Sequence, residues 1–147
     1  MKKNNFKISI VVRDFYPELS DLLFENCFNQ LIKNGINKDF ISTYKVSGVF
    51  EIPGLVNQIA KRDFPDAIIT LGVVIKGETP QFDFISAACA NSISLLTIQN
   101  EFPITFGVLT TNTYKQALKR AQTKGLGIED TTLSSINTYQ SIKSNKS

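Results

Sequence analysis

The chain has 147 residues, of which 42% are apolar and 20% charged. This length predicts one globular domain over residues 1–147, and this composition excludes extensive disorder. The net charge of +3, without a cluster of Lys and Arg, argues against a nucleic-acid-binding protein. Histidine is absent, which excludes histidine-ligated metals, histidine-based triads and histidine general acid–base catalysis.

The two cysteines, Cys27 and Cys89, lie far apart in helix-like stretches. We therefore expect buried free thiols in a reducing compartment rather than a disulfide or a metal site. The first apolar run, residues 8–12, is too short for a signal peptide, and no window approaches the length of about 18 apolar residues that a membrane span needs. These features predict a cytoplasmic protein without a membrane partner.

Short apolar runs rich in β-branched residues alternate with segments whose apolar residues recur every three or four positions. In chain order they predict a strand at 7–13, a helix from Pro17 to the Asn34-Gly35 pair, a strand at 40–46, a helix after Pro53, a strand at 67–75, a helix near 81–100, a strand at 104–109, and helices at 113–122 and 128–142. The polar C-terminal residues are expected to fray.

This alternation predicts an α/β fold, a three-layer α/β/α sandwich with a four-stranded parallel sheet, flavodoxin-like in architecture. Ligands of such sheets bind beyond the C-terminal ends of the strands. The segments in which to search for a site are therefore residues 13–17, 47–53, 76–83 and 110–113.

The first two of these segments carry an aromatic pair and a carboxylate. RDFYPE (residues 13–18) places Phe15 or Tyr16 over the sheet edge, or uses them for ordinary packing at a helix entry. It lacks the glycines of a dinucleotide turn and the phosphate loop of an FMN site. In SGVFEIP (residues 47–53), Gly48 permits a tight turn, and Glu51 either accepts hydrogen bonds from a polar ligand or serves as a first-turn helix acid.

The third segment, KGETPQFDF (residues 76–84), places Gly77 and Thr79 between a strand and a helix. Backbone N–H groups at a helix N-terminus form a ready anion site, and the site gains weight if a cation lies near it. Arg120 is the candidate cation because a guanidinium can bind phosphate with two parallel hydrogen bonds. The alternative for Arg120 is a solvated helix face.

Three segments together resemble the 6,7-dimethyl-8-ribityllumazine synthase family: FEIP (residues 50–53), LGVVIKGETPQFDF (71–84) and ITFGVLTTNTYKQALKRAQTK (104–124). The likeness runs from about residue 7 to 124, with the segments in the family's order and spacing. It implies a four-stranded parallel sheet, pentamers that in some members assemble into 60-subunit icosahedral shells, and active sites between neighbouring subunits. It implies no metal or cofactor, small-molecule substrates, and riboflavin synthase as a further partner.

The reaction that this resemblance implies is a step of riboflavin biosynthesis. The family joins 5-amino-6-(D-ribitylamino)uracil to 3,4-dihydroxy-2-butanone 4-phosphate, and phosphate and water leave. By position, Phe15 resembles the aromatic residue that stacks on the pyrimidinedione, and Arg120 resembles the phosphate-binding arginine of a neighbouring subunit. The other residues carried over hold the ring and ribityl chain (Val49, Phe50, Glu51), line the floor (Val73, Val74, Ile75), bind phosphate (Gly77, Glu78, Thr79) or come from the same neighbour (Phe106).

The sequence departs from the family at the general acid–base residue, a histidine two positions before an aspartate. Here that place is Gln81, before Phe82 and Asp83, and a glutamine amide carries no titratable proton near neutral pH. General acid–base catalysis is typically worth roughly 10²–10⁴-fold. Because positioning and phosphate binding remain, we expect a slowed synthase in which Asp83, Glu51 or a water moves protons. Lesser departures lie at Tyr16, Lys76 and Ile128.

Three alternatives remain open at this point. A non-catalytic relative that binds flavin-like ligands or only builds a shell would also explain the departures. The archaeal-type riboflavin synthase shares the fold, but the GET segment argues against it. A flavodoxin-like or receiver-like binding module is disfavoured by the missing phosphate loop and by a lone Asp14 in place of an acidic pair.

Overall fold

A computed structural model describes residues 5–122 and 127–145 of the chain. Its elements follow one another as β1 (Ile8–Arg13), α1 (Pro17–Lys33), η1 (Lys38–Phe40), β2 (Ile41–Val46), η2 (Val49–Glu51), α2 (Ile52–Arg62), β3 (Ala67–Ile75), α3 (Gln81–Gln99), β4 (Ile104–Thr111), α4 (Tyr114–Gln122) and α5 (Ile128–Ser144). This order is the alternation that the sequence predicts. The Thr-Lys pair at 123–124, at the end of the third family-like segment, lies outside the described residues.

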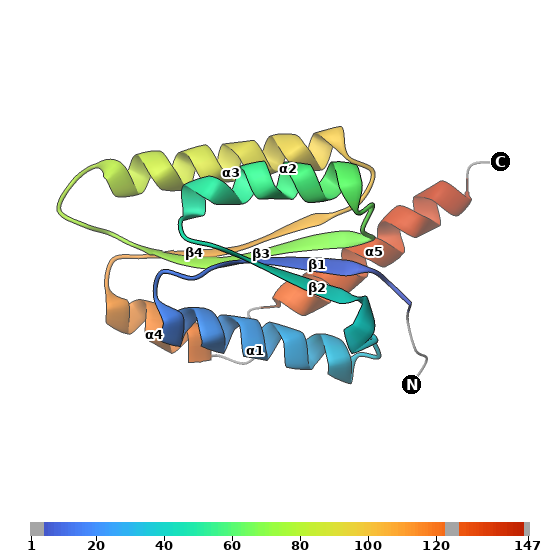
Figure 1. Cartoon of the computed structure of the whole chain (residues 1–147), viewed down its shortest axis with the longest axis horizontal. Coiled ribbons are helices and arrows are strands. Elements are labelled where there is room, and N and C mark those ends of the chain that lie inside the picture. Colours follow the sequence, from blue (N-terminus) through green and yellow to red (C-terminus); the bar gives the residue numbers. More distant parts are fainter. Residues whose placement is uncertain (1–4, 123–126, 146–147) are drawn as a thin grey trace.

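The four strands form one parallel sheet in the order β2-β1-β3-β4. Strand β3 is buried from Ala67 to Val74 and is apolar apart from Thr70, because helices cover both faces of the sheet. Its C-terminal end lies beside the ends of β1 and β4, and the loops that follow these strands gather at one edge of the sheet (Figure 1). The expected three-layer α/β/α architecture is confirmed.

The helices divide between the two faces of the sheet. Helices α2 and α3 cover one face, and α1, α4 and α5 pack on the other (Figure 1). Strand alternation supplies both cores: Ile68 and Val74 of β3 face α2 and α3, whereas Ile69 and Leu71 belong to the core beneath α1 and α5. We refer to these as the α2/α3 face and the α1/α4/α5 face.

Helix α5 approaches the sheet closely at one glycine. A Cβ on Gly107 would lie 2.6 Å from the carbonyl oxygen of Thr70 and 2.8 Å from Cδ1 of Ile128. Glycine is therefore required for β4 to accommodate β3 on one side and the first turn of α5 on the other. Further along α5, the Thr132 hydroxyl lies 2.7 Å from that of Thr105, and Ile136 is buried, so the helix is anchored along its first half.

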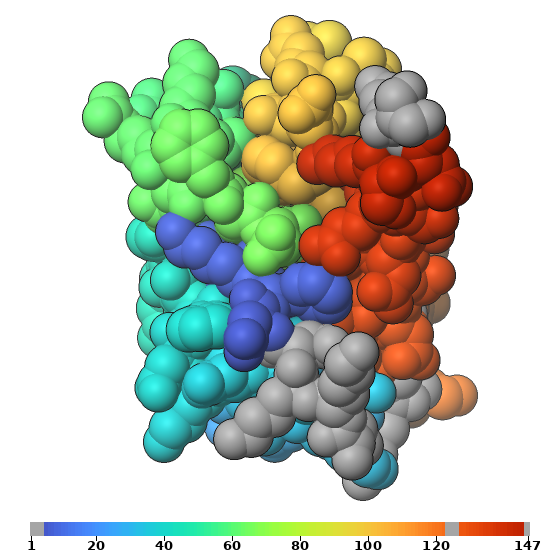
Figure 2. Space-filling model, turned by 90° about the vertical axis from the view of Figure 1, so that its right-hand side faces the viewer, coloured from blue at the N-terminus to red at the C-terminus, as the bar shows by residue number. Residues whose placement is uncertain are grey.

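The expectation that the C-terminal residues fray is wrong as far as Ser144, because α5 continues to that residue. Propagating a helix costs much less free energy than nucleating one, so the anchored first turns carry the polar turns that follow. Figure 2 views the end of the molecule where the strands begin, with α5 along one flank and the segment that leads into β1 in the middle. None of the helices in the described ranges is long and apolar enough to cross a membrane.

Candidate active site

A hollow of about 450 Å³ opens on the α2/α3 face, at the edge of the sheet where the strands end. Three of the four segments selected from the sequence contribute to it, as expected for a ligand site of a parallel sheet. We call it the Arg13–Glu51 pocket, and its lining residues are Arg13, Gly48, Val49, Phe50, Glu51, Val74, Gln81 and Ile85. A second cavity, of about 340 Å³, lies at the opposite end, beside Phe64, Phe102 and Tyr139.

The turn between β2 and α2 presents the Glu51 carboxylate to this pocket. The chain is extended at Gly48 and then turns through η2, where the Glu51 N–H donates to the Gly48 carbonyl oxygen over 3.2 Å. A Cβ on Gly48 would collide with Oε2 of Glu51, so the glycine leaves the space that this carboxylate occupies. Val49 is buried beneath the turn, whereas Phe50 and Glu51 are exposed.

Arg13 is the pocket residue that the sequence interpretation missed. It is the last residue of β1, and alternation places its side chain on the same face as Val11, toward α2 and α3. Its Nη1 donates to the carbonyl oxygen of Val73 on β3, and its carbonyl oxygen accepts from the Ser20 hydroxyl at 2.6 Å. The signal that could have found it is its place at a strand end on the face where the other pocket segments converge.

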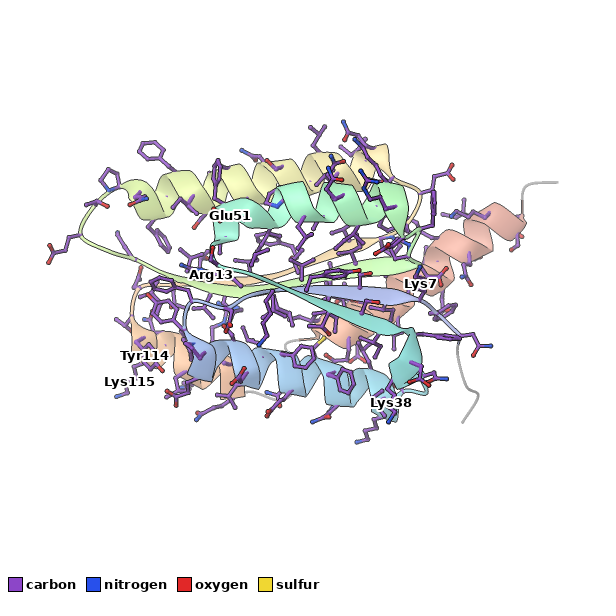
Figure 3. The ribbon with its side chains drawn as sticks, viewed as in Figure 1. Lys7, Arg13, Lys38, Glu51, Tyr114 and Lys115 are labelled. Atoms are coloured by element: carbon purple, nitrogen blue, oxygen red, sulfur yellow. The ribbon has the colours of Figure 1, made fainter. Side chains whose placement is uncertain are left out.

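Burial lowers the pKa of Arg13, and the facing Tyr16 and the negative charge of Glu51 oppose that shift. The guanidinium remains charged at neutral pH because arginine starts from so high a pKa. Figure 3 shows Arg13 at the end of β1 and Glu51 above it at the base of α2, on the same side of the sheet. The pocket therefore contains a cation and a carboxylate that are half-buried and exposed, respectively.

Three aromatic rings lie together at the entry to α1, beside Arg13 but outside the set of residues that line the pocket. The Phe15 and Tyr16 rings meet edge to face with centroids 4.9 Å apart, and Tyr16 meets Tyr114 of α4 at 6.1 Å. The Arg13 guanidinium lies over the Phe15 ring, 4.6 Å from its centroid. Phe15 is 58% exposed, so much of its surface remains available to a planar ligand.

The loop from Lys76 to Pro80 connects β3 to α3 and is exposed throughout. The Lys76 N–H donates to the Thr111 carbonyl oxygen at 2.9 Å, which fixes the start of the loop to β4. The loop then runs through Gly77, Glu78 and Thr79 to the N-terminus of α3, where Gln81 reaches the pocket. Backbone N–H groups at such a helix start, with the helix dipole, favour an anion.

A protein-family model for 6,7-dimethyl-8-ribityllumazine synthase matches residues 5–140. The chain is also 39% identical over 127 residues to the 6,7-dimethyl-8-ribityllumazine synthase of Ruthia magnifica subsp. Calyptogena magnifica, an alignment that covers 80% of this chain and 76% of the relative.

The chain belongs to the lumazine synthase family. The resemblance seen in its sequence is therefore confirmed, and membership places the chain in riboflavin biosynthesis, in an enzyme family with small-molecule substrates and oligomeric assembly. These matches do not support the two alternative functions, a non-catalytic flavin-binding or shell-forming relative and the archaeal-type riboflavin synthase.

Lumazine synthase floor residues were expected at Val73, Val74 and Ile75, but their side chains do not share a face. Val74 lines the pocket. Val73 and Ile75 point to the other side, into the core formed with Leu19 of α1, because neighbouring side chains of a strand alternate. Val73 reaches the pocket side only through its carbonyl oxygen, which accepts the hydrogen bond from Arg13.

Phe15 and the loop of residues 77–79 lie next to the pocket residues Arg13 and Gln81 without lining the pocket, and two further residues expected in a lumazine synthase site lie elsewhere on the chain. Arg120 is exposed on α4 and lines a separate hollow with Thr111 and Gln116, on the other side of the sheet from α3 (Figure 1). Phe106, which is 41% exposed on the edge strand β4, lines another hollow with Thr97. A single chain thus holds Glu51 and Gln81 together and leaves Arg120 and Phe106 elsewhere.

The structure also shows where the residues of the lesser departures from the family lie. Tyr16 lies in the aromatic group, and Lys76 is exposed at the start of the loop. Ile128 is buried against Leu71 and Gly107, so it is a core residue and not a substitute for a pocket lysine. The two cysteines are free and buried, as expected, and burial raises the pKa of Cys27 to about 12 and that of Cys89 to about 11.

Proposed function

We propose that the chain condenses 5-amino-6-(D-ribitylamino)uracil with 3,4-dihydroxy-2-butanone 4-phosphate, forming 6,7-dimethyl-8-ribityllumazine and releasing phosphate and water. The observation that carries the proposal is the Arg13–Glu51 pocket, in which the FEIP turn meets Gln81, the first residue of α3 after the GET-containing loop, within a chain of this family. The pocket is concave, has a mainly apolar lining with a few polar groups, and adjoins an exposed helix N-terminus suited to phosphate.

In this proposal the pyrimidinedione stacks on Phe15 and rests on Val74. The Val49–Glu51 turn contacts the ring and the ribityl chain, with Glu51 as a hydrogen-bond acceptor for hydroxyl or ring N–H groups. The phosphate lies at Gly77, Glu78 and Thr79, which precede α3. Holding the amine of one substrate against the ketone of the other converts a bimolecular step into an effectively unimolecular one.

Gln81 sets the expected rate. It lines the pocket at the first turn of α3, where the family has its general acid–base histidine, and its amide cannot shuttle protons. The amine attacks the ketone with loss of one water to give an imine, phosphate is then eliminated, and attack of the ribitylamino nitrogen on the remaining carbonyl closes the ring with loss of a second water. We propose that water, Asp83 or Glu51 takes the protons in these steps, so that the chain is a slower synthase that works by positioning and phosphate binding.

We further propose that the site is completed by a second copy of the chain within a pentamer. Arg120 and Phe106 are exposed on parts of the molecule that do not line the Arg13–Glu51 pocket. A head-to-tail ring would bring the Arg120 of one subunit to the phosphate loop of the next, because such interfaces pair two different surfaces. Further assembly into a 60-subunit shell and contact with riboflavin synthase remain part of the same proposal.

The test is lumazine formation from the two purified substrates, followed by absorbance with and without the protein. A rate clearly above the spontaneous condensation, which saturates with both substrates, is the expected result. A rate equal to the spontaneous one, with the pyrimidine still bound, would refute the reaction and show a ligand-binding or shell-forming relative. Phosphate release measured in the same samples checks that the two products form in equal amounts.

A further inference from the structure

Arg13 lies on the floor of the pocket with part of its hydrogen-bonding capacity unused. Its side chain crosses β3 at Gly72, where a Cβ would come within 3.1 Å of the Arg13 Cβ, and its Nη1 donates to the Val73 carbonyl oxygen. The Nε–H is buried and has no hydrogen-bond partner among the described residues. A buried donor without an acceptor costs free energy, so a ligand that supplies an acceptor to this guanidinium would gain binding free energy.

The surroundings of the guanidinium indicate which acceptor suits it. It lies over the ring of Phe15, the residue proposed to stack on the heterocycle, and it is therefore within the reach of groups attached to that heterocycle. The nearby charge of Glu51 acts on it, yet Arg13 and Glu51 form no direct ion pair within the described part of the chain. A cation whose charge is already partly balanced favours a neutral carbonyl over a phosphate dianion.

The geometry thus points to a specificity-determining contact: we propose that Arg13 binds a ring carbonyl oxygen of a pyrimidinedione held against Phe15. This inference rests on the proposed function, whose pyrimidine substrate carries two such carbonyls, and it assigns Arg13 a role in substrate selection. Arg13 would disfavour rings that lack the carbonyl, since this half-buried guanidinium would then keep a buried donor without an acceptor. The tether to Val73 holds the guanidinium in place before the ligand arrives, which reduces the entropy lost on binding.

The test is a binding cycle with three probes that cannot condense: 6-(D-ribitylamino)uracil and two analogues, each lacking one of its ring carbonyls. Dissociation constants are measured by titration calorimetry for the unaltered chain, Arg13→Met, Arg13→Lys and the matched control Arg62→Met. Arg62 is exposed on α2, where it bonds to Gln58, so its replacement removes the same charge outside the pocket. Thermal unfolding of each variant shows whether the fold is retained.

We expect the unaltered chain to lose roughly 10- to 100-fold in affinity when one particular carbonyl is removed, as a charge-assisted hydrogen bond predicts. Arg13→Met should bind the full uracil that much more weakly and lose nothing further with the same analogue. Arg13→Lys should restore part of the discrimination, because an ammonium donates without the planar fork. Arg62→Met should behave as the unaltered chain does.

Equal losses for all three probes in Arg13→Met would overturn the inference and leave Arg13 as a structural tether. Equal affinities of the unaltered chain for the three probes would overturn it too, and this comparison does not depend on any variant folding. Failure to bind 6-(D-ribitylamino)uracil at all would refute the inference and the proposed function together. Arg13-dependent binding without condensation in the absorbance assay would support the inference and refute the reaction.

Discussion

The two faces of the sheet are used differently. The α1/α4/α5 face is filled by two apolar clusters, and its polar contacts, such as Thr105 with Thr132, join one element to another. The α2/α3 face has its own core, but at the C-terminal edge of the sheet that core gives way to Arg13, Glu51 and Gln81. The difference teaches that a parallel sheet can hold its stability on one side while one end of the other side remains open for chemistry.

The largest expected effect comes from Arg120, which lies on the α1/α4/α5 face of its own chain. The proposal places its side chain in the Arg13–Glu51 pocket of a neighbouring subunit. Arg120→Ala should lower the rate of lumazine formation by roughly 10²–10³-fold, because removing a preorganised cation from a transferring phosphate costs transition-state stabilisation. The fold should be unaffected, since Arg120 is exposed. Steady-state rates with the ketone phosphate varied, together with thermal unfolding, measure both.

Mixing two variants tests whether the pocket of one subunit and the Arg120 of another form one active site. Equal amounts of Arg120→Ala and Glu51→Gln subunits, unfolded and reassembled together, should recover about a quarter of the sites if pairing in the ring is random. Each restored site would take its pocket from one variant and its arginine from the other. No recovery, with mixed oligomers confirmed by mass, would contradict a site shared between copies.

The next prediction concerns the packing of the α1/α4/α5 face. Gly107→Ala should reduce the free energy of unfolding by about 3 kcal/mol, because the new methyl group meets the Thr70 backbone and Ile128 with little room for either to move. Gly54→Ala is the matched control: it lies in α2 with nothing within 4 Å of the new Cβ, so it should stabilise by about 0.5–1 kcal/mol. Urea unfolding of both variants makes the comparison.

A change at the open edge should raise activity. Gln81→His introduces a group that can carry a proton near neutral pH, so the rate of lumazine formation should rise by roughly 10- to 100-fold, below the full share of acid–base catalysis. The rate should also acquire a pH dependence near neutral pH that follows the protonation of the new imidazole. Gln99→His, at the other end of α3, is the control, and an equal rise in both variants would argue against Gln81 as the acid–base position.

A smaller effect should follow from closing the space beside Glu51. Gly48→Ala should displace the Glu51 carboxylate and weaken binding of 6-(D-ribitylamino)uracil by about tenfold, the value of one ordinary hydrogen bond. Stability should change little, because the new methyl group meets the end of a flexible side chain. Calorimetric binding and thermal unfolding of the same sample separate the two effects, and unchanged affinity would remove Glu51 from the ligand site.

The last comparison concerns one buried thiol from each face, whose effect is absent at neutral pH and develops only above pH 9. The folded-state pKa of Cys27 and Cys89 is raised to about 12 and about 11, so folding stability is fully present below the unfolded thiol pKa near 9 and is lost as pH rises above it. Each thiol should contribute a slope of about 1.4 kcal/mol per pH unit in that window. Urea unfolding of Cys27→Ala and Cys89→Ala between pH 8.5 and 11 should show a shallower decline than the unaltered chain.

The fold could be predicted from the sequence because its strongest signals are local. The apolar run of β3 and the helical periodicity of α1 specify their elements with no knowledge of the rest of the chain. The sequence predicts a helix at 128–142 but also fraying of the polar residues at its end, and only the anchorage of Ile128 and Ile136 explains why α5 continues to Ser144. That anchorage depends on Gly107, which lies far away in the sequence.

The pocket was predictable where a segment carries its own signature, as with Gly48, Glu51 and Gln81. Arg13 was missed because an arginine at a strand end is ordinary in a sequence, and only the neighbouring strand supplies the Val73 carbonyl that turns it inward. Val73 and Ile75 were assigned to the floor because position in a motif does not say which way a strand side chain points. The alternation of side chains along a strand predicts that Arg13 and Val74 point to the pocket face and that Val73 and Ile75 point away from it.

The separation of Arg120 from the chain's own pocket has a consequence for how the protein would behave in a cell or a test tube. If two copies supply one site, turnover per chain depends on how many chains are present, and dilution below the assembly threshold switches the chemistry off without unfolding anything. A newly synthesised subunit would then be inactive until it assembled with other subunits. Abundance itself would act as the control on the pathway.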